Sequence, residues 1–336
     1  MPTPATRRQV LSRWGRAVGA MPLAAALVAV TLPGQARAAD AYPTRPLKIV
    51  VPFSPGAITD ATSRILATEL TKVIGQSVLV ENRPGGGTVI GTQAVKNAPA
   101  DGYTILFQLS SLATNVYLLK QPGYALADFS AVAMLGQAGY VLVAGQKNSK
   151  FPTIQELIAF GKANPGALNA SGTADGAATV IGSKLKRATG VDWALINYKG
   201  GAEAVQAVMS GDVHFSLPTQ AAPLIYANPD RLRILAVTSK KRLDFLPDVP
   251  TFTELGYPID EQTWFGLFVR SDTPPDVLAR IRSSLAEVLN SATMKEQLRK
   301  LRISPYEGTL EGVPARLKQE LEDFTQEARK LGIEPQ

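Results

Sequence analysis

The sequence predicts a protein of two α/β lobes rather than a single sheet with a tail. Its 336 residues, of which 45% are hydrophobic, are enough for one large domain or for two ordinary ones with packed cores. Strand-like and helix-like segments alternate from Leu47 onward, and strand-like segments recur as far as residue 269. Units of strand, helix and strand favour parallel sheets with right-handed crossovers.

The first elements follow clear local patterns. Residues 47–51 form an apolar strand that Pro52 ends, and residues 60–74 repeat apolar side chains at helical spacing and stop at Gly75. The pattern then predicts a strand at 77–81, a Pro/Gly loop at 82–87, a helix at 90–97 and a strand at 104–108.

The same alternation continues through the rest of the chain. Residues 132–135 and 140–144 are rich in strand-forming side chains. Thr153 is a suitable cap for a helix at 153–164, because Glu156 stands three positions further on. We expect further helices at 176–189, 202–209, 275–290 and 314–331, and strands at 213–217, 233–238 and 265–269.

The N-terminal segment has the pattern of an export signal. Residues 1–16 are polar and basic, residues 17–32 are apolar, and Ala36-Arg37-Ala38 has the small-x-small pattern of a cleavage site. The apolar run is shorter than the roughly 20 residues that a membrane span needs. We therefore expect residues 1–38 to be a signal peptide cleaved near Ala38, and the mature chain to be periplasmic. Arg7-Arg8 loosely resembles a twin-arginine signal, so the export route stays open.

Composition excludes several classes of protein. The net charge of +7 owes five arginines to the first 38 residues, and the remainder has 30 basic and 28 acidic residues. This balance gives no electrostatic reason to expect a nucleic-acid partner. The chain has no cysteine and one histidine, His214, which excludes thiol nucleophiles, cysteine zinc sites and multi-histidine metal sites. We expect no cofactor.

The usual catalytic motifs are missing. A Gly-x-Gly-x-x-Gly match that starts at Gly85 fails, because Ile90 stands where the last glycine is needed. The chain has no Gly-x-Ser-x-Gly motif, and its carboxylates form no spaced pair on one loop. His214 lies on an expected strand, where a structural role is the ordinary one. A periplasmic hydrolase or lyase that uses His214 or a loop carboxylate remains the enzyme alternative.

Two loops of small residues point to anion binding. Residues 51–60 and 169–176 each run from a strand into a helix, where backbone N–H groups and the helix dipole favour an anion. Ser54, Thr59, Ser171 and Thr173 add hydroxyl groups. One such loop in each lobe, facing across a cleft, would hold a carboxylate without an arginine. The alternative is that both are ordinary turns.

Several segments resemble one known family. They are Tyr42–Pro46 (YPTRP), Val51–Asp60 (VPFSPGAITD), Val80–Gly87 (VENRPGGG), Asp101–Thr104 (DGYT), Asn197–Gly200 (NYKG) and Asp248–Pro258. In this order they resemble the tripartite tricarboxylate transporter receptors, the Bug family of periplasmic solute-binding proteins, over about residues 42–331.

The resemblance implies a two-lobed Venus-flytrap fold, each lobe a sheet flanked by helices. Lobe 1 would comprise residues 42–141 and 266–336, and lobe 2 residues 142–265. It also implies capture of a small carboxylate (a dicarboxylate, an amino acid or an aromatic acid) and its delivery to membrane permease subunits. We expect a monomer. The alternative partner is a membrane signalling protein to which the ligand-bound form is presented.

The resemblance also implies a set of ligand-binding positions. They are Phe53, Ser54, Gly56, Ala57, Thr59, Asp60, Ser110, Ser111, Asn115, Ser171, Thr173, Ala174, Asp175 and Tyr198, with Lys199 near the mouth. Asp60 is expected to fix its loop rather than touch an anion. Pro218 stands where the family often has an aspartate that recognises an amino group, which argues against an amino-acid ligand. Asp175 is placed to take over that role.

Overall fold

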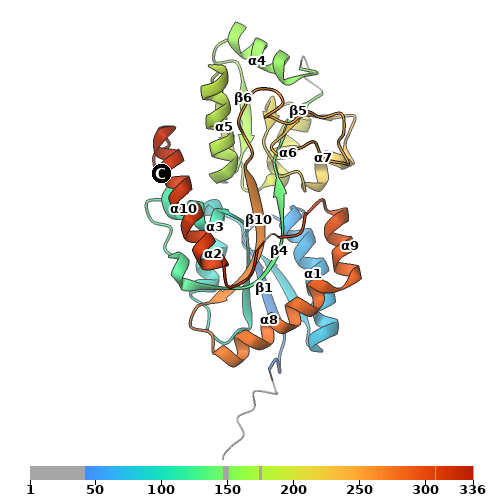
Figure 1. Cartoon of the computed structure of the whole chain (residues 1–336), viewed down its shortest axis with the longest axis vertical. Helices are drawn as coiled ribbons and strands as arrows, with labels where there is room; N and C mark the ends of the chain where they lie inside the picture. The colour runs from blue at the N-terminus through green and yellow to red at the C-terminus, as the bar shows by residue number, and fades with distance from the viewer. Residues whose placement is uncertain (1–41, 147–150, 174–175, 307, 336) are drawn as a thin grey trace, which may run out of the picture. The chain divides into compact units, whose positions relative to one another are not determined.

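The computed structural model describes residues 42–146, 151–173, 176–306 and 308–335, and this part is a two-lobed α/β protein with two five-stranded sheets (Figure 1). The first sheet has the order β2-β1-β3-β10-β4, and the second has the order β7-β6-β8-β5-β9. The strands of the first sheet are β1 (Leu47–Val51), β2 (Val78–Asn82), β3 (Thr104–Gln108), β4 (Phe129–Gly139) and β10 (Gln262–Arg270). Those of the second are β5 (Val141–Gly145), β6 (Asn169–Gly172), β7 (Ala194–Asn197), β8 (Phe215–Ser216) and β9 (Leu232–Val237).

Each sheet combines parallel and antiparallel pairs. β1 pairs in parallel with β2 and β3, and β6 pairs in parallel with β7 and β8, as the strand–helix–strand units predicted. β10 is antiparallel to β3 and β4, and β5 is antiparallel to β8 and β9. The sheets are therefore mixed.

Helices flank both sheets. Those that pack with the first sheet are α1 (Ile58–Ile74), α2 (Val89–Lys96), α3 (Ser111–Leu118), α8 (Pro275–Asn290), α9 (Ala292–Lys300) and α10 (Val313–Lys330). Those that lie with the second are α4 (Ile154–Ala163), α5 (Gly176–Thr189), α6 (Gly201–Ser210) and α7 (Pro223–Ala227). Within the described residues, no helix combines the length and the apolarity that a membrane span requires.

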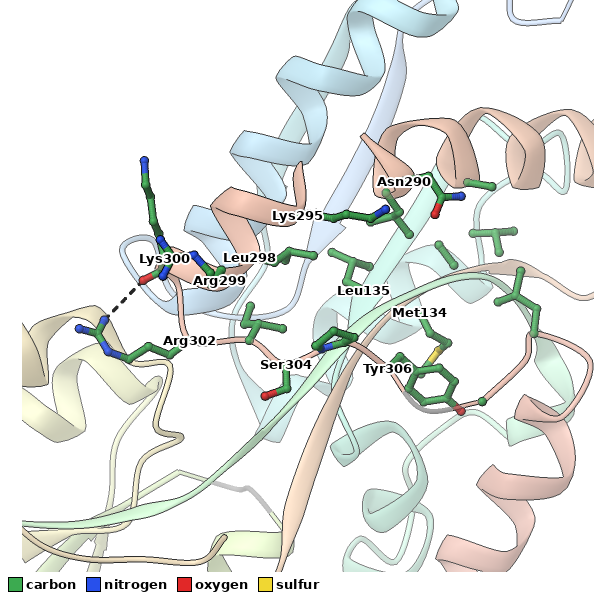
Figure 2. A pocket seen from close by; sticks show the side chains of 18 of the residues that line it. Met134, Leu135, Asn290, Lys295, Leu298, Arg299, Lys300, Arg302, Ser304 and Tyr306 are labelled. Carbon is green, nitrogen blue, oxygen red and sulfur yellow. Dashed lines mark hydrogen bonds between the residues drawn. The ribbon is translucent and has the colours of Figure 1, made fainter. Parts of the chain in front are cut away.

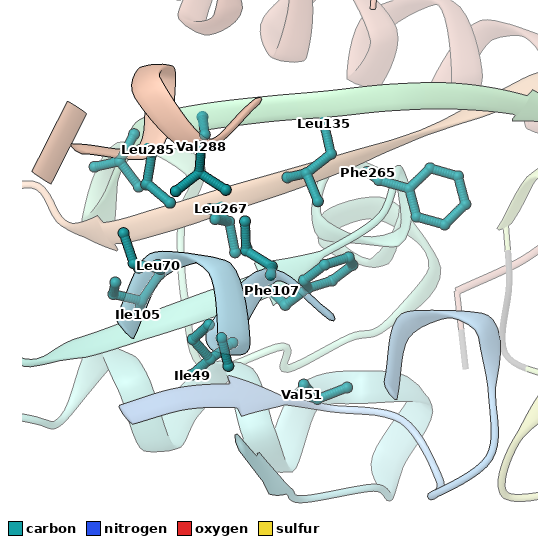
Figure 3. Close-up of a cluster of buried hydrophobic side chains, with 14 of the residues drawn as sticks. Ile49, Val51, Leu70, Ile105, Phe107, Leu135, Phe265, Leu267, Leu285 and Val288 are labelled. Carbon is teal, nitrogen blue, oxygen red and sulfur yellow. The ribbon is translucent and has the colours of Figure 1, made fainter. Parts of the chain in front are cut away.

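The central strands of the first sheet, β1, β3 and β10, are mostly buried on both faces and mostly apolar. Successive residues point to opposite faces. Ile49 and Phe107 therefore meet Leu70 of α1 and Leu285 of α8, as Figure 3 shows, whereas Leu106 packs on the other face with helices α3 and α10. This two-sided core holds the carboxyl end of β1, from which the loop to α1 emerges, in a fixed position.

The chain passes between the two sheets at Tyr140, between β4 and β5, and again just before β10. Thr238 is fully buried and contacts both passages. Its Oγ1 accepts the Tyr140 N–H at 2.8 Å and donates to the Glu261 carbonyl oxygen at 2.7 Å. Its own N–H donates to the Tyr140 carbonyl oxygen at 2.9 Å. The Thr238 side chain thus forms hydrogen bonds with both segments that pass between the sheets. β10 joins the first sheet from Gln262, so the lobe boundary expected at residues 265 and 266 falls inside this strand.

Candidate functional site

A small pocket lies where two helices begin, one from each sheet. Its volume is about 80 Å³. The loop before α1 and the first turn of α1 line one side with Phe53, Gly56, Ala57, Ile58 and Thr59. The other side includes Thr173 and the first residues of α6, Gly201 and Ala202. We call this space the helix-start pocket.

Both helices begin without a side-chain cap. Ala57 stands at the cap position of α1 and Gly200 at that of α6, and neither makes a side-chain capping hydrogen bond. The first N–H groups of an α-helix have no acceptor within the helix, and the dipole places partial positive charge there. The two helix starts therefore offer backbone donors to an anion in the pocket.

Gly200 also allows the two loops to approach each other closely. A Cβ atom at this position would lie 2.6 Å from the Ser54 hydroxyl oxygen and 3.0 Å from the Ser54 Cβ, closer than real side chains come. Ser54 belongs to the loop before α1, and its carbonyl oxygen accepts the Ala57 N–H at 3.2 Å. The absence of a side chain at Gly200 lets the start of α6 lie against this loop.

Thr59 supplies a buried polar group to the pocket. The residue is 1% exposed, and its hydroxyl has no hydrogen-bond partner in the described structure. Thr173 and Thr219 also line the pocket. A buried hydroxyl normally finds a partner, because leaving it without one costs about 1–3 kcal/mol. The Thr59 hydroxyl is therefore a candidate partner for a ligand in this pocket.

Asp60 holds the loop in shape. Its Oδ2 accepts the Gly56 N–H at 3.0 Å, and its Oδ1 lies 2.9 Å from the Arg64 guanidinium. Burial would raise the pKa of the Asp60 carboxyl, but the hydrogen bonds from Arg64 and Gly56 outweigh it and hold this pKa below its usual value. Asp60 stays ionised and turned toward its own loop, which is the position expected from the sequence.

A second pocket of about 120 Å³ adjoins the first, and we call it the α5 pocket. The two share Thr173, Gly201, Leu217 and Pro218. Residues of α5, strands β6, β7 and β8 and the start of α6 surround it, and Trp193 and Leu195 contribute its largest side chains. The shared residues place the two pockets side by side.

The structure brings together part of the predicted set. Phe53, Gly56, Ala57, Thr59 and Thr173 line the helix-start pocket. Ser171 lines the α5 pocket, although its hydroxyl already donates to the Ala204 carbonyl oxygen at 2.7 Å. Tyr198 is half-buried against the apolar cluster of α6 and lines neither pocket, and Ala174 and Asp175 lie outside the described residues.

The structure places three of the predicted residues elsewhere. Ser110 lines a different cavity, and its hydroxyl lies 2.9 Å from the Thr263 hydroxyl. The Ser111 hydroxyl donates to Gln108, and the Asn115 amide donates to Thr88 at 3.2 Å, in a buried hydrogen-bond network. Their position after β3 suggested ligand contact, but α3 begins at Ser111 and directs these side chains inward.

His214 has the surroundings of a structural residue. Its Nδ1 lies 2.6 Å from the Asn169 side-chain oxygen, and its ring packs beside Phe151 and Phe160. Burial lowers the pKa of the imidazole, and a hydrogen bond with the Asn169 backbone opposes that shift. His214 lines neither pocket. The described residues also contain no cluster of three potential metal-ligating side chains.

A larger cavity, of about 1100 Å³, lies among β4, α8, α9 and the segment after α9 (Figure 2). Its basic residues include Arg282, Lys295 and Lys300, and its apolar floor includes Leu135 and Leu298. It includes no helix start and shares no lining residue with the helix-start pocket. Sequence analysis did not predict this cavity, because its lining comes from segments that are far apart in the chain.

The predicted ligand-binding positions do not include the residues on the α6 side of the helix-start pocket. Gly201, Ala202, Leu217 and Thr219 line it. The signal was present, since Gly200-Gly201 precedes a helical pattern in the same way as the other two small-residue loops. The sequence alone does not predict which helix of the second sheet starts opposite α1, and the structure shows that it is α6.

Two helix-flanked mixed sheets, with a pocket between a helix start from each, define the periplasmic binding protein class. Residues 62–328 match the model of the tripartite tricarboxylate transporter family receptors. The chain belongs to this family, whose members are solute-binding receptors and not a class of enzyme.

Relatives and solved structures agree with this assignment. BugT of Bordetella pertussis is 38% identical over 77% of this chain and 80% of its own. The structure of the periplasmic binding protein BugD matches with a TM-score of 0.82 and 30% identity, over 88% of this chain and all of that one. A protein of R. palustris solved with adipate matches with a TM-score of 0.82 and 28% identity, over 88% of this chain and all of that one.

Proposed function

We propose that this protein binds a small carboxylate in the helix-start pocket and delivers it to a membrane permease of the tripartite tricarboxylate type. The observation that carries the proposal is the Thr59 hydroxyl, buried and without a partner at the uncapped start of α1. A carboxylate oxygen is the acceptor that this hydroxyl and the neighbouring N–H groups lack. The adipate found in a solved relative supports the choice of ligand chemistry.

Capture would proceed by closure of two lobes. We propose that one lobe is built on the first sheet and the other on the second, close to the expected division at residues 141 and 265, with hinges near Tyr140 and just before β10. Both lobes contribute residues to the pocket lining, so a ligand contacts both of them only in the closed form. Those contacts would favour the closed form, which the permease then recognises. Residues 1–38 would direct export to the periplasm and be removed.

The decisive experiment is calorimetric titration of residues 39–336 with a panel of carboxylates, from acetate to adipate and benzoate. At least one should bind and raise the melting temperature by mass action. If none binds at millimolar concentration, the proposal fails.

A matched pair of variants then tests the site. Thr59→Val removes a hydroxyl that has no partner in the fold, so stability should not fall, whereas the affinity for the best carboxylate should drop about tenfold. Ser63→Ala is the control, because Ser63 lies on the same helix with a buried, unpartnered hydroxyl but does not line the pocket. Equal losses in both variants would contradict the assignment of Thr59.

A further inference from the structure

The two adjoining pockets differ in their lining, and this difference indicates the chemistry of the ligand's body. The described residues that line the helix-start pocket include no charged side chain. Away from the helix starts, Leu109, Val205, Leu217 and Leu224 make its wall apolar. Polar donors are therefore gathered at the helix starts, and the rest of the space suits hydrocarbon.

The α5 pocket continues this apolar path. Trp193, Leu195, Leu217 and Ala178 line it, and the hydroxyls of Ser171 and Ser216 already donate to backbone carbonyl oxygens. The hydrogen atoms of these two hydroxyls are therefore already engaged in hydrogen bonds within the protein. What the pocket offers a ligand is mainly apolar surface.

Lys186 is the single charged residue among the described lining of the α5 pocket, and it is already engaged. Its Nζ lies 2.5 Å from an Asp192 carboxylate oxygen and donates to the Trp193 carbonyl oxygen at 2.8 Å. The Lys186 and Asp192 side chains are 36% and 84% exposed, so this ion pair lies near the surface and offers a second carboxylate no buried positive charge. Burial of a charge without a partner costs far more than burial of a methyl group.

Gly182 leaves room for the far end of the ligand. It lies inside α5, and a Cβ atom there would meet Trp193 at 3.7 Å and Leu217 at 3.8 Å, which are ordinary contact distances. Pockets of about 80 and 120 Å³ hold about seven groups of methylene size, at about 30 Å³ each. The helix-start pocket alone holds about three.

From this division we infer that the ligand is a monocarboxylate with an uncharged, apolar body of about six carbons. The inference rests on the proposed function, because it places the carboxylate at the starts of α1 and α6. The body passes Leu217 and Pro218 into the α5 pocket, where Gly182 and Trp193 bound it. The protein thus selects against acids with a second charged group.

The test compares three acids that share one carbon chain, namely hexanoate, adipate and norleucine. Calorimetry on residues 39–336 should give hexanoate an affinity at least about tenfold higher than that of adipate, which adds a carboxylate, and of norleucine, which adds an amino group. Adipate or norleucine binding as tightly as hexanoate would overturn the inference and leave the proposed function standing. Failure of every carboxylate would instead overturn the proposed function.

Filling the α5 pocket provides the second test. Gly182→Leu should weaken hexanoate at least about tenfold and leave propionate, which fits the helix-start pocket, within about twofold. Ala188→Leu on the exposed face of the same helix is the matched control and should change neither. Gly182→Ala, a smaller step with ordinary contacts, should give an intermediate loss and keeps the test valid if Gly182→Leu misfolds. Equal losses for the two acids, or no loss for hexanoate, would refute the assignment of the α5 pocket.

Discussion

The guanidinium carbon of Arg302 lies 3.5 Å from the centre of the Tyr226 ring. Arg302 follows α9, beside the first sheet, whereas Tyr226 lies on α7, beside the second. The Arg302 carbonyl oxygen also accepts the Gln220 side-chain amide at 3.3 Å. Thr219, next to Gln220, lines the helix-start pocket, as do α7 residues Pro223 and Leu224. This stack therefore joins the wall of the pocket to the other lobe.

Arg302→Ala should lower the free energy of unfolding by about 1 kcal/mol, because a partly desolvated cation–π pair is lost. Arg302 has a left-handed backbone, with φ at 60°, and alanine keeps the Cβ atom there, so the comparison isolates the rest of the side chain. Urea denaturation measures the change. Arg299→Ala removes an exposed charge whose partner Glu296 is on the same helix, and it should shift stability by less than about 0.5 kcal/mol. Similar losses in the two variants would argue against the stack.

Thr238→Val should lower the free energy of unfolding by about 2 kcal/mol. Valine keeps the shape but leaves the Tyr140 N–H and the Glu261 carbonyl oxygen without their buried partner. Thr238→Ser keeps the hydroxyl and should recover most of the loss. Chemical denaturation of the three proteins distinguishes these outcomes, and a serine variant as unstable as the valine variant would contradict the role of the hydroxyl.

Asp60→Asn should destabilise the protein at neutral pH, by about 1–2 kcal/mol, because it replaces an ionised acceptor of the Gly56 N–H and removes the partner of Arg64. The pKa of Asp60 is lowered in the folded state, so its stabilisation is present above the unfolded value and is lost as pH falls through the folded one. The difference between wild type and variant should therefore shrink in acid. A constant difference across the pH range would exclude a contribution from the charge.

His214 should make the folded protein less stable in mild acid. Burial lowers the pKa of the imidazole in the folded state, so the neutral form is favoured there. The contribution to stability is complete above the unfolded pKa and falls as pH drops below it toward the folded value. Unfolding free energies at about pH 7.5 and about pH 5 should differ more in the wild type than in His214→Gln. An identical pH dependence would contradict the assignment.

The alternation of strands and helices, and the loop before α1, could be predicted because they depend on local patterns. α1 begins at Ile58, close to the expected Asp60, and α4 carries the predicted capping box of Thr153 and Glu156. The helices α3, α7 and α9 and the strand β7 were not predicted. β7 is exposed along its whole length, so its apolar periodicity is weak.

The site could be predicted only in part, for a physical reason. Phe53 and Thr59 follow directly from a strand end and a helix start, and the structure places both in the pocket. Asn115 also follows a strand end, that of β3, but it lies on the inward face of α3. Its side chain is therefore buried against Thr88. Gly182 gave no signal, because its importance depends on Trp193 and Leu217, which approach it only in the folded chain.

The lack of a side chain at Gly182 sets the length of guest that the protein admits. A helix interior generally gains about 0.5–1 kcal/mol when alanine replaces glycine, so filling this position strengthens α5 while it shortens the accepted guest. A larger side chain at position 182 should therefore increase both the stability of α5 and the preference for short acids. A single substitution would shift the receptor toward shorter acids. This position is the natural starting point for engineered fatty-acid sensors that differ in the chain length they accept.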